Sequence, residues 1–395
     1  MVGNILAGVA QAAGASHRIR SGADRHGEKW YSGKFGRALM DSRELNRREF
    51  VRITTTAATA AAAGMAVASG SAAPTDRGDP TKTRSYNENM EYRRLGRTNL
   101  WLSAIGLGGH WKKIPYEYNT PEFKKNRREV IAACLDHGIN YVDACWDHEV
   151  IAYGEAIKGR RDEIYFGYSF GAHESRFPEW GGSLQKMKEG FEMGLKAGGL
   201  DYVDLWRITM HEQTSRSNTE KEIEIAMEAL EWAKRTGKAR FTGVSSHDRN
   251  WITEAVAKYP QLEVIVTPYT AGSKRAPQGS MFEAFEKYDV GFIGIKPFAS
   301  GAVFKSRGMP DAPTKEEDDR RARLVLRYVL SCPQLTTAIP GLITVDQVKN
   351  AALAIIERRK EDLSASEQAE VQEIADHMWK NLPHDYGWLR QWEWV

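Results

Sequence analysis

Short runs of β-branched and aromatic residues alternate with amphipathic segments along the chain from residue 91 onward. Runs of this kind, bounded by glycine and polar residues, predict strands, and apolar residues three and four positions apart predict helices. The predicted strands are Ala104–Leu107, Asn140–Val142, Ile164–Tyr168, Tyr202–Ile208, Arg240–Val244, Val264–Thr267, Gly291–Ile295 and Thr336–Ile339. Eight strand–helix units in series are typical of a (β/α)8 TIM barrel, which is the α/β fold that we predict for residues 91–395.

The helical pattern is clearest between residues 219 and 236. Thr219 and Glu222 have the spacing of a capping box, apolar residues recur on one face, and Gly237 follows as a stop. A C-terminal helix is predicted from Ser364 to Lys380. The aromatic tail that begins within this helix contains Trp379, Tyr386, Trp388, Trp392 and Trp394. Because large aromatic side chains are seldom left exposed together, we expect this tail to pack over the barrel.

A doubly wound sheet is the main alternative to the barrel. That fold usually carries a G-x-G-x-x-G turn after its first strand. Residues 106–111 read Gly-Leu-Gly-Gly-His-Trp and lack the third glycine. The sequence therefore favours the barrel.

Composition narrows the range of partners. The chain is 42% hydrophobic and 27% charged, which suits a folded protein with a large core. Its 55 basic and 52 acidic residues give a formal charge of +3, so there is no concentrated basic surplus and nucleic acid is not an expected partner. Three cysteines without a C-x-x-C pair predict neither a disulfide framework nor a thiolate zinc site.

An export signal is predicted upstream of the barrel. Residues 46–52 read Asn-Arg-Arg-Glu-Phe-Val-Arg, a mild Ala/Thr-rich run follows, and residues 66–68 supply an A-x-A cleavage pattern. This order resembles the twin-arginine (Tat) signal peptide. We therefore assign residues 40–73 to a signal peptide, residues 74–90 to a linker and residues 1–39 to an upstream extension, with Met40 expected as the true start.

The signal has consequences for partners and location. It predicts that the Tat export machinery is a partner and that the chain reaches the periplasm or cell envelope. No window has the roughly 18 consecutive apolar residues of a spanning helix, so no stable membrane span is expected after signal removal. The twin-arginine route exports folded proteins, often with a cofactor already inserted, which favours a bound cofactor.

An ordered set of segments carries a family resemblance. The segments are Tyr92–Thr98, Ala104–Gly108, Gly138–Asp143, Tyr153–Ile157, Asp201–Trp206, Gly243–Ser245, Lys296–Phe298 and Ala338–Gly341. Together they resemble the aldo/keto reductase superfamily over roughly residues 91–358. The resemblance implies a barrel that binds NADP in an extended pose and reduces carbonyl groups.

The resemblance also implies a catalytic tetrad, which this chain carries in substituted form. Hydride addition to a carbonyl leaves an alkoxide, so a general acid must protonate it. The family uses a Tyr as the acid, tuned by a Lys that an Asp holds, and a His that orients the substrate oxygen. Asp143 matches the Asp, whereas His148 stands at the Tyr position, Ser169 at the Lys position and Thr209 at the His position.

The family's cofactor contacts are also reduced. Ile295 stands where a tyrosine usually stacks on nicotinamide, and Gly341 and Gln347 stand where basic residues grip the adenosine phosphate. A helix N-terminus after Gly341 and the turn at Ser300 are the remaining places for a phosphate to meet backbone N–H groups. The candidate residues for binding NADP(H) are Ser245, Ser246, Lys296, Ser300, Gly301, Gly341, Gln347 and Asn350.

Five histidines follow the first five predicted strands. They are His110, His148, His173, His211 and His247. Catalytic residues of this fold come from the carboxyl ends of the strands, so these side chains face one rim. Either His148 or His211 replaces the missing acid, or several histidines bind a divalent metal with Asp143 or Asp147.

The predicted function is that of an exported, NADP-linked oxidoreductase that reduces or oxidises a small carbonyl, alcohol or sugar. The alternative is a divergent member of the fold without hydride chemistry. Such a protein would be a metal-dependent lyase or hydrolase, or a ligand-binding protein that uses the histidine-rich rim.

Overall fold

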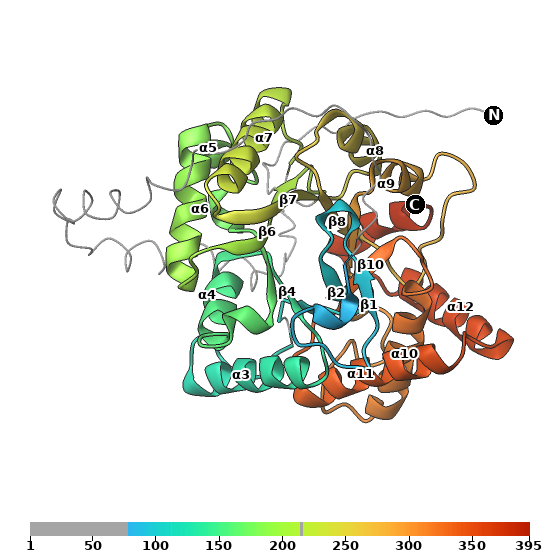
Figure 1. The fold of residues 1–395 in the computed structure, drawn as a ribbon. Coiled ribbons are helices and arrows are strands. Elements are labelled where there is room, and N and C mark those ends of the chain that lie inside the picture. The colour runs from blue at the N-terminus through green and yellow to red at the C-terminus, as the bar shows by residue number, and fades with distance from the viewer. Residues whose placement is uncertain (1–77, 112, 214–215) are drawn as a thin grey trace, which may run out of the picture. The chain divides into compact units, whose positions relative to one another are not determined.

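Eight parallel strands form one sheet in the computed structural model, which describes residues 78–111, 113–213 and 216–395. The strands are β3 (Leu107–Gly108), β4 (Tyr141–Ala144), β5 (Tyr165–Tyr168), β6 (Val203–Met210), β7 (Ala239–Ser246), β8 (Val264–Pro268), β9 (Gly291–Ile295) and β10 (Leu335–Ile339). They pair in chain order, and a parallel bridge between Ile105 and Ala338 joins the last strand to the first. The backbone N–H of Gly106 donates to the carbonyl oxygen of Ala338 at 2.9 Å, so the sheet closes into the predicted TIM barrel (Figure 1).

All the predicted strands are present, with shifted ends. The first is shorter than expected, while β6 and β7 each run two residues past their predicted ends, to Met210 and Ser246. Hydrogen bonding between β6 and β7 continues as far as the pair Met210 and Ser246, which explains the extension.

Helices surround the barrel strands (Figure 1). They are α3 (Pro121–Asp136), α4 (Asp147–Ala156), α5 (Pro178–Gly181), α6 (Leu184–Gly198), α7 (Glu220–Arg235), α8 (Arg249–Lys258), α9 (Met281–Tyr288), α10 (Lys315–Val329), α11 (Val345–Lys360) and α12 (Ala365–Lys380). The predicted capping box forms at α7, because the Thr219 side chain accepts from the N–H of Glu222 and the Glu222 carboxylate accepts from the N–H of Thr219.

The barrel interior is apolar toward the amino ends of the strands. A hairpin of β1 (Tyr92–Arg94) and β2 (Trp101–Ser103) covers this end. Buried apolar residues of the hairpin and the strands pack together here, namely Leu95, Leu100, Leu102, Tyr141, Tyr165, Leu205, Val264, Val266, Ile293 and Ile339. The interior is therefore packed rather than hollow at this end, and chemistry is left to the opposite end.

Residues 78–90, most of the predicted linker, lie against the barrel. Arg84 donates to the carboxylate of Asp204 at 3.1 Å and to the carbonyl oxygen of Ile164 at 2.8 Å. Asp204 is buried and also pairs with Arg161 and Arg240. Three arginines on one carboxylate tie this segment to the start of β6.

The aromatic tail packs on the barrel, as the sequence predicts. Trp392 is buried, and its carbonyl oxygen accepts from the hydroxyl of Ser273 at 2.7 Å. The ring of Trp388 stacks on His247 with centroids 4.1 Å apart. The tail thus reaches the carboxyl end of β7.

Two predictions concern the N-terminal part of the chain. The upstream extension and the signal peptide fall in residues 1–73, outside the described residues. Within the described ranges, none of the helices combines the length and apolar character that crossing a bilayer requires.

Candidate functional site

Asp143, the residue that matches the family tetrad, is held by an arginine inside the barrel. Arg207 on β6 donates to both carboxylate oxygens, at 3.0 Å from Nε and 2.5 Å from Nη2, and the hydroxyl of Tyr141 donates at 3.0 Å. Arg207 lies two residues after Leu205 of the apolar interior and therefore points inward. Burial lowers the pKa of Arg207, but Asp143, Cys145 and Tyr141 together raise it more, so the net shift is well upward. Asp143 is thus held in a buried bidentate ion pair.

Ser169, which the sequence predicts at the lysine position of the tetrad, is hydrogen-bonded to a buried glutamate. Its hydroxyl donates to Oε1 of Glu174, which also accepts from the backbone N–H of Thr209 at 3.3 Å. Glu174 is 2% exposed, and its second oxygen has no hydrogen-bond partner within the described ranges. Burial raises the pKa of Glu174, and this outweighs the opposing effect of Arg176.

Thr209, at the histidine position of the family, is bonded to a buried arginine. Arg176 donates to its hydroxyl at 2.8 Å, to the carboxylate of Glu212 at 2.5 Å and to the sulfur of Cys145 at 3.0 Å. The guanidinium lies over the ring of Trp146 at 4.4 Å. Ser169 and Thr209 are therefore both part of a closed polar network.

The two histidines predicted as replacement acids are packed against aromatic rings. The His148 ring lies 5.8 Å from both Trp111 and Tyr118, edge to face, and burial lowers its pKa. The strand ends at Met210, and His211 adopts a positive φ of 48°, so His211 does not continue along β6 beside Thr209. Its ring lies 4.7 Å from Trp251 of α8, and burial lowers its pKa too.

His110 is the exposed histidine of this rim and is held by a carboxylate. Its Nδ1 lies 2.7 Å from Oε1 of Glu149, and its own backbone N–H donates to the same oxygen at 2.6 Å. The other carboxylate oxygen accepts from the N–H groups of Cys145 and Trp146. The His110 side chain is 41% exposed, whereas Glu149 is fully buried.

His173 makes a similar pair with Asp147 at 2.6 Å. Its ring, however, stacks on Phe170 at 4.9 Å and meets Trp180 edge-on at 4.7 Å. This packing fixes the ring between neighbours and limits what it can contact.

The metal alternative is not supported by the placement of these side chains. In the part of the chain that the structure describes, no group of three or more His, Cys, Asp or Glu residues is placed to hold a metal ion. The reason is that the rim histidines pair with separate carboxylates or pack on separate aromatic rings.

The predicted cofactor residues at the ends of β7 and β9 face the same rim. Ser245 and Ser246 are buried at the end of β7, where the Ser246 hydroxyl accepts from the N–H of Asp248 at 3.1 Å. Lys296 follows β9 and makes no ion pair with any described residue, and its amine lies 5.7 Å from the ring centroid of Trp388. Ser300 and Gly301, with φ of 57° and 84°, form a tight turn just beyond. An unpaired amine beside such a turn fits a phosphate group.

The predicted residues around α11 fit a phosphate less well. Gln347 accepts from the N–H of Ile343 at 2.8 Å, and the Thr344 side chain caps the N–H of Gln347. Asn350 bonds to Arg323 and to the carbonyl oxygen of Asp319 on α10. Of the three predicted residues Gly341, Gln347 and Asn350, only Gly341 is exposed. A dinucleotide would therefore find its charged contact at Lys296 rather than at α11.

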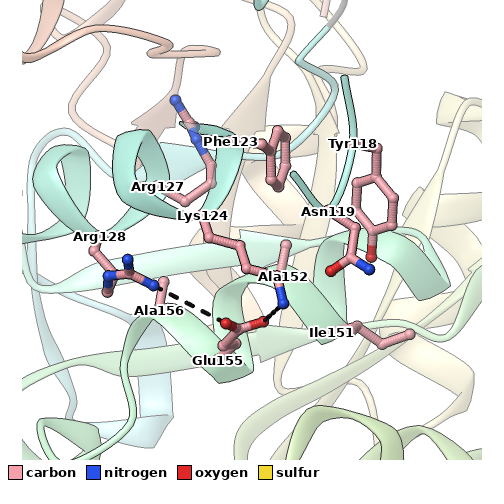
Figure 2. A pocket seen from close by; sticks show the side chains of 10 residues that line it. All are labelled: Tyr118, Asn119, Phe123, Lys124, Arg127, Arg128, Ile151, Ala152, Glu155 and Ala156. Carbon is pink, nitrogen blue, oxygen red and sulfur yellow. Dashed lines mark ion pairs between the residues drawn. The ribbon is translucent and has the colours of Figure 1, made fainter. Parts of the chain in front are cut away.

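A small hollow lies between α3 and α4, outside the barrel mouth (Figure 2). Glu155 pairs there with Lys124 at 3.1 Å and Arg128 at 4.0 Å. The free space is about 10 Å³, enough for about one water molecule. This hollow is no candidate for a substrate site.

Comparison with known proteins settles the family. The sequence model of the aldo/keto reductase family matches residues 104–376. The chain belongs to the aldo/keto reductase family. This match covers every strand of the barrel after the bridge at Ile105, and it confirms the resemblance seen in the sequence motifs.

Relatives of this aldo/keto reductase carry different names. The uncharacterized oxidoreductase YqkF of Bacillus subtilis is 24% identical over 319 residues, covering 72% of this chain and 98% of that protein. A probable voltage-gated potassium channel subunit beta of Oryza sativa is 26% identical over 231 residues, covering 54% of this chain and 66% of that one. An aldo-keto reductase of Klebsiella pneumoniae, solved in complex with NADPH, is 20% identical with a TM-score of 0.55, covering 72% of this chain and 95% of that one.

Sequence reasoning missed the partners of the predicted residues. Arg207 stands in the middle of a fully buried strand, between the large apolar residues Trp206 and Ile208, which is a signal of a charge inside the barrel. Glu174 and Arg176 lie in a loop without regular spacing, so nothing in the sequence placed them beside Ser169 and Thr209. Glu149 stands next to His148, but its carboxylate serves His110, 39 residues earlier in the chain.

Proposed function

We propose that this aldo/keto reductase is an NADP(H)-linked oxidoreductase that interconverts a small carbonyl compound, sugars included, and the corresponding alcohol. The observation that carries the proposal is Lys296, an amine without an ion pair among the described residues, which lies at the carboxyl end of a barrel strand just before the tight turn at Ser300 and Gly301. Family membership and the NADPH-bound structure of a protein with the same fold support it.

Different residues of the proposed site would bind the phosphates and the nicotinamide of the dinucleotide. Lys296 and the turn at Ser300 and Gly301 would hold the phosphates of the dinucleotide. Ser245 and Ser246 lie at the end of β7, which β8 separates from β9, and there they would face the nicotinamide. When bound, the nucleotide supplies or accepts the hydride, and the chain itself must position the substrate and move its proton.

We further propose that the protein acts outside the cytoplasm, in the periplasm or cell envelope. The paired Arg47 and Arg48, the mild apolar run and the Ala66-Val67-Ala68 pattern support export through the Tat machinery. An exported reductase lacks a supply of free NADPH, so it would retain its nucleotide and recycle it by alternating oxidation and reduction.

The second candidate is a binding protein without hydride chemistry. Two observations favour it: Ser169 and Thr209 are closed into a buried network, and Trp388 lies against Lys296. A relative named as a channel subunit rather than an enzyme also supports it.

Titration with NADPH separates the two candidates. The chain from about Ser69 is purified and its tryptophan quenching and nucleotide fluorescence are followed as NADPH is added. The oxidoreductase proposal expects saturable binding that Lys296→Gln weakens, while Lys196→Gln on the exposed face of α6 leaves it unchanged. No binding at millimolar NADPH would leave only the second candidate.

A further inference from the structure

The pairing of His110 with Glu149 has the form of a proton-transfer dyad. The carboxylate of Glu149 can only accept hydrogen bonds, because burial, which raises its pKa, is outweighed by His110, His148 and the N–H of Cys145, and the pKa falls to about 2. The N–H groups of His110 and Trp146 also donate to it. Nδ1 of His110 therefore carries a proton and donates it at 2.7 Å. Nε2 is then the nitrogen left to exchange a proton with another molecule, and it makes no hydrogen bond within the described ranges.

The backbone is shaped to bring these two side chains together. A Cβ atom at Gly109 would lie 2.2 Å from the carboxyl carbon of Glu149, so only glycine allows the carboxylate into this position. His110 itself adopts a positive φ of 58°. A strained non-glycine residue next to an obligatory glycine is typical of a functional site.

The dyad also contains the more exposed histidine of the two histidine–carboxylate pairs of this rim, because the His110 side chain is 41% exposed and that of His173 is 25% exposed. Asp143, Ser169 and Thr209 are at most 4% exposed, and each is bonded to a buried partner. His148 and His211 pack on aromatic rings with lowered pKa values.

His110 lies at the same end of the barrel as the proposed nucleotide contact, because His110 follows β3 and Lys296 follows β9. Trp388 of the tail contacts both the ring of His247, which follows β7, and the amine of Lys296. The carbonyl oxygen of Gly109 is also the nearest neighbour of exposed Gly341, beyond β10. The loops after β3, β7, β9 and β10 thus lie at the carboxyl end of the barrel.

We propose that His110 is the general acid and base of this enzyme and that Glu149 is its positioning residue. The inference rests on the proposed oxidoreductase function. In reduction, the carbonyl carbon receives a hydride from a bound nicotinamide nucleotide, the C=O electron pair moves to oxygen, and that oxygen takes the proton from Nε2 of protonated His110. In oxidation, neutral Nε2 takes the hydroxyl proton as the hydride leaves. The tetrad tyrosine is thereby replaced from β3 rather than β4.

The first test is turnover of nitrobenzaldehyde with NADPH by single variants. His110→Ala should lower kcat by about 100-fold or more while NADPH still binds. Added imidazole should restore part of the rate, which a merely structural role of the ring would not allow. Glu149→Gln should lower kcat by about 10- to 100-fold. His173→Ala, which removes the packed histidine of the similar pair with Asp147, should stay within a few-fold of wild type.

A second readout does not need turnover. Diethylpyrocarbonate modifies neutral, accessible imidazoles, and peptide mass mapping gives the rate at each histidine. The rates are compared at alkaline pH, where the imidazoles are neutral. His110 should then react faster than exposed His384, which has no ion pair among the described residues, because the hydrogen bond from Nδ1 to the carboxylate makes Nε2 more nucleophilic. Glu149→Gln should remove the difference.

The outcomes separate this inference from the proposed function. Full kcat in His110→Ala, or a rate loss that imidazole does not restore, overturns the acid–base role while NADPH binding keeps the oxidoreductase. Absence of NADPH binding overturns the oxidoreductase, and the modification rates still decide whether the dyad exists. A His110 rate equal to that of His384, or unchanged by Glu149→Gln, refutes the dyad itself.

Discussion

At the scale of single residues, the barrel mouth is built from charges that meet inside the fold. Asp143 was found from the sequence because it matches a motif and ends a strand. Its partner Arg207 could not be identified from the sequence, because pairing across the barrel depends on strand register rather than on local spacing. The same limit hid Glu174, Arg176 and the use of Glu149 by His110. Sequence patterns thus located one end of each interaction, and the fold supplied the other.

Removal of Arg207 should strongly destabilise the protein. In Arg207→Met, the carboxylate of Asp143 would stay buried without its ion-pair partner, which costs about 3–5 kcal/mol of unfolding free energy. Urea unfolding followed by fluorescence measures this loss. The double variant Asp143→Asn/Arg207→Met removes both charges and should recover much of it. A loss below about 1 kcal/mol in the single variant would show that the pair behaves like a surface salt bridge.

Glu149 should contribute a specific part of the acid sensitivity. Its folded pKa of about 2 lies below the ordinary value of 4.5, so its stabilising effect is complete above pH 4.5 and is lost as the pH falls toward 2. The shift corresponds to roughly 3 kcal/mol, taking about 1.4 kcal/mol for each pKa unit. Unfolding free energies of wild type and Glu149→Gln between pH 6 and 2 measure it. Parallel curves for the two proteins would contradict the assignment.

At the scale of elements, the alternation of strands and helices was predictable and the loops were not. Periodicity and caps located all eight strands and the helix α7, because these signals are local. The ends of β6 and β7 were misplaced, since hydrogen bonding to the neighbouring strand carries them further. The positive φ of His211, which turns the chain away from β6, has no counterpart in local residue preferences.

The aromatic tail should restrict access to Lys296. The ring of Trp388 stacks on His247 and also contacts the amine of Lys296, so a phosphate approaching that amine must compete with the cation–π contact. Trp388→Ala should therefore tighten NADPH binding by about two- to fivefold, which is the change in affinity that corresponds to the free energy of one exposed cation–π contact. Trp394→Ala, which changes an exposed ring of the same tail, is the matched control and should leave the affinity unchanged. Weaker binding in Trp388→Ala would mean that the ring supports the nucleotide instead.

At the scale of the whole molecule, the proposed function combines the aldo/keto reductase barrel with a predicted export signal. Eight βα units predicted the barrel, and the order of the motifs predicted the family. The eight-stranded sheet confirms the first prediction, and the family match confirms the second. The substrate could not be predicted, because the loops that border the mouth determine it and they carry no recognised binding motif.

Export should depend on the arginine pair. Replacing both Arg47 and Arg48 by lysine should leave the precursor in the cytoplasm of a Tat-competent bacterium, because the signal requires the pair rather than the charge. Fractionation and immunoblotting measure the distribution. Arg52→Lys, in the same basic segment, should be exported normally. Equal export of all three proteins would remove the basis for the periplasmic location.

The central claim is that hydride passes between a nicotinamide nucleotide and a carbonyl in this barrel. The most direct measurement uses NADPH deuterated at the transferring position, with nitrobenzaldehyde as acceptor, and mass spectrometry of the alcohol formed. The account predicts one deuterium on the former carbonyl carbon, at a rate that falls in His110→Ala. Alcohol without deuterium, or no alcohol from a protein that binds the nucleotide, would contradict it.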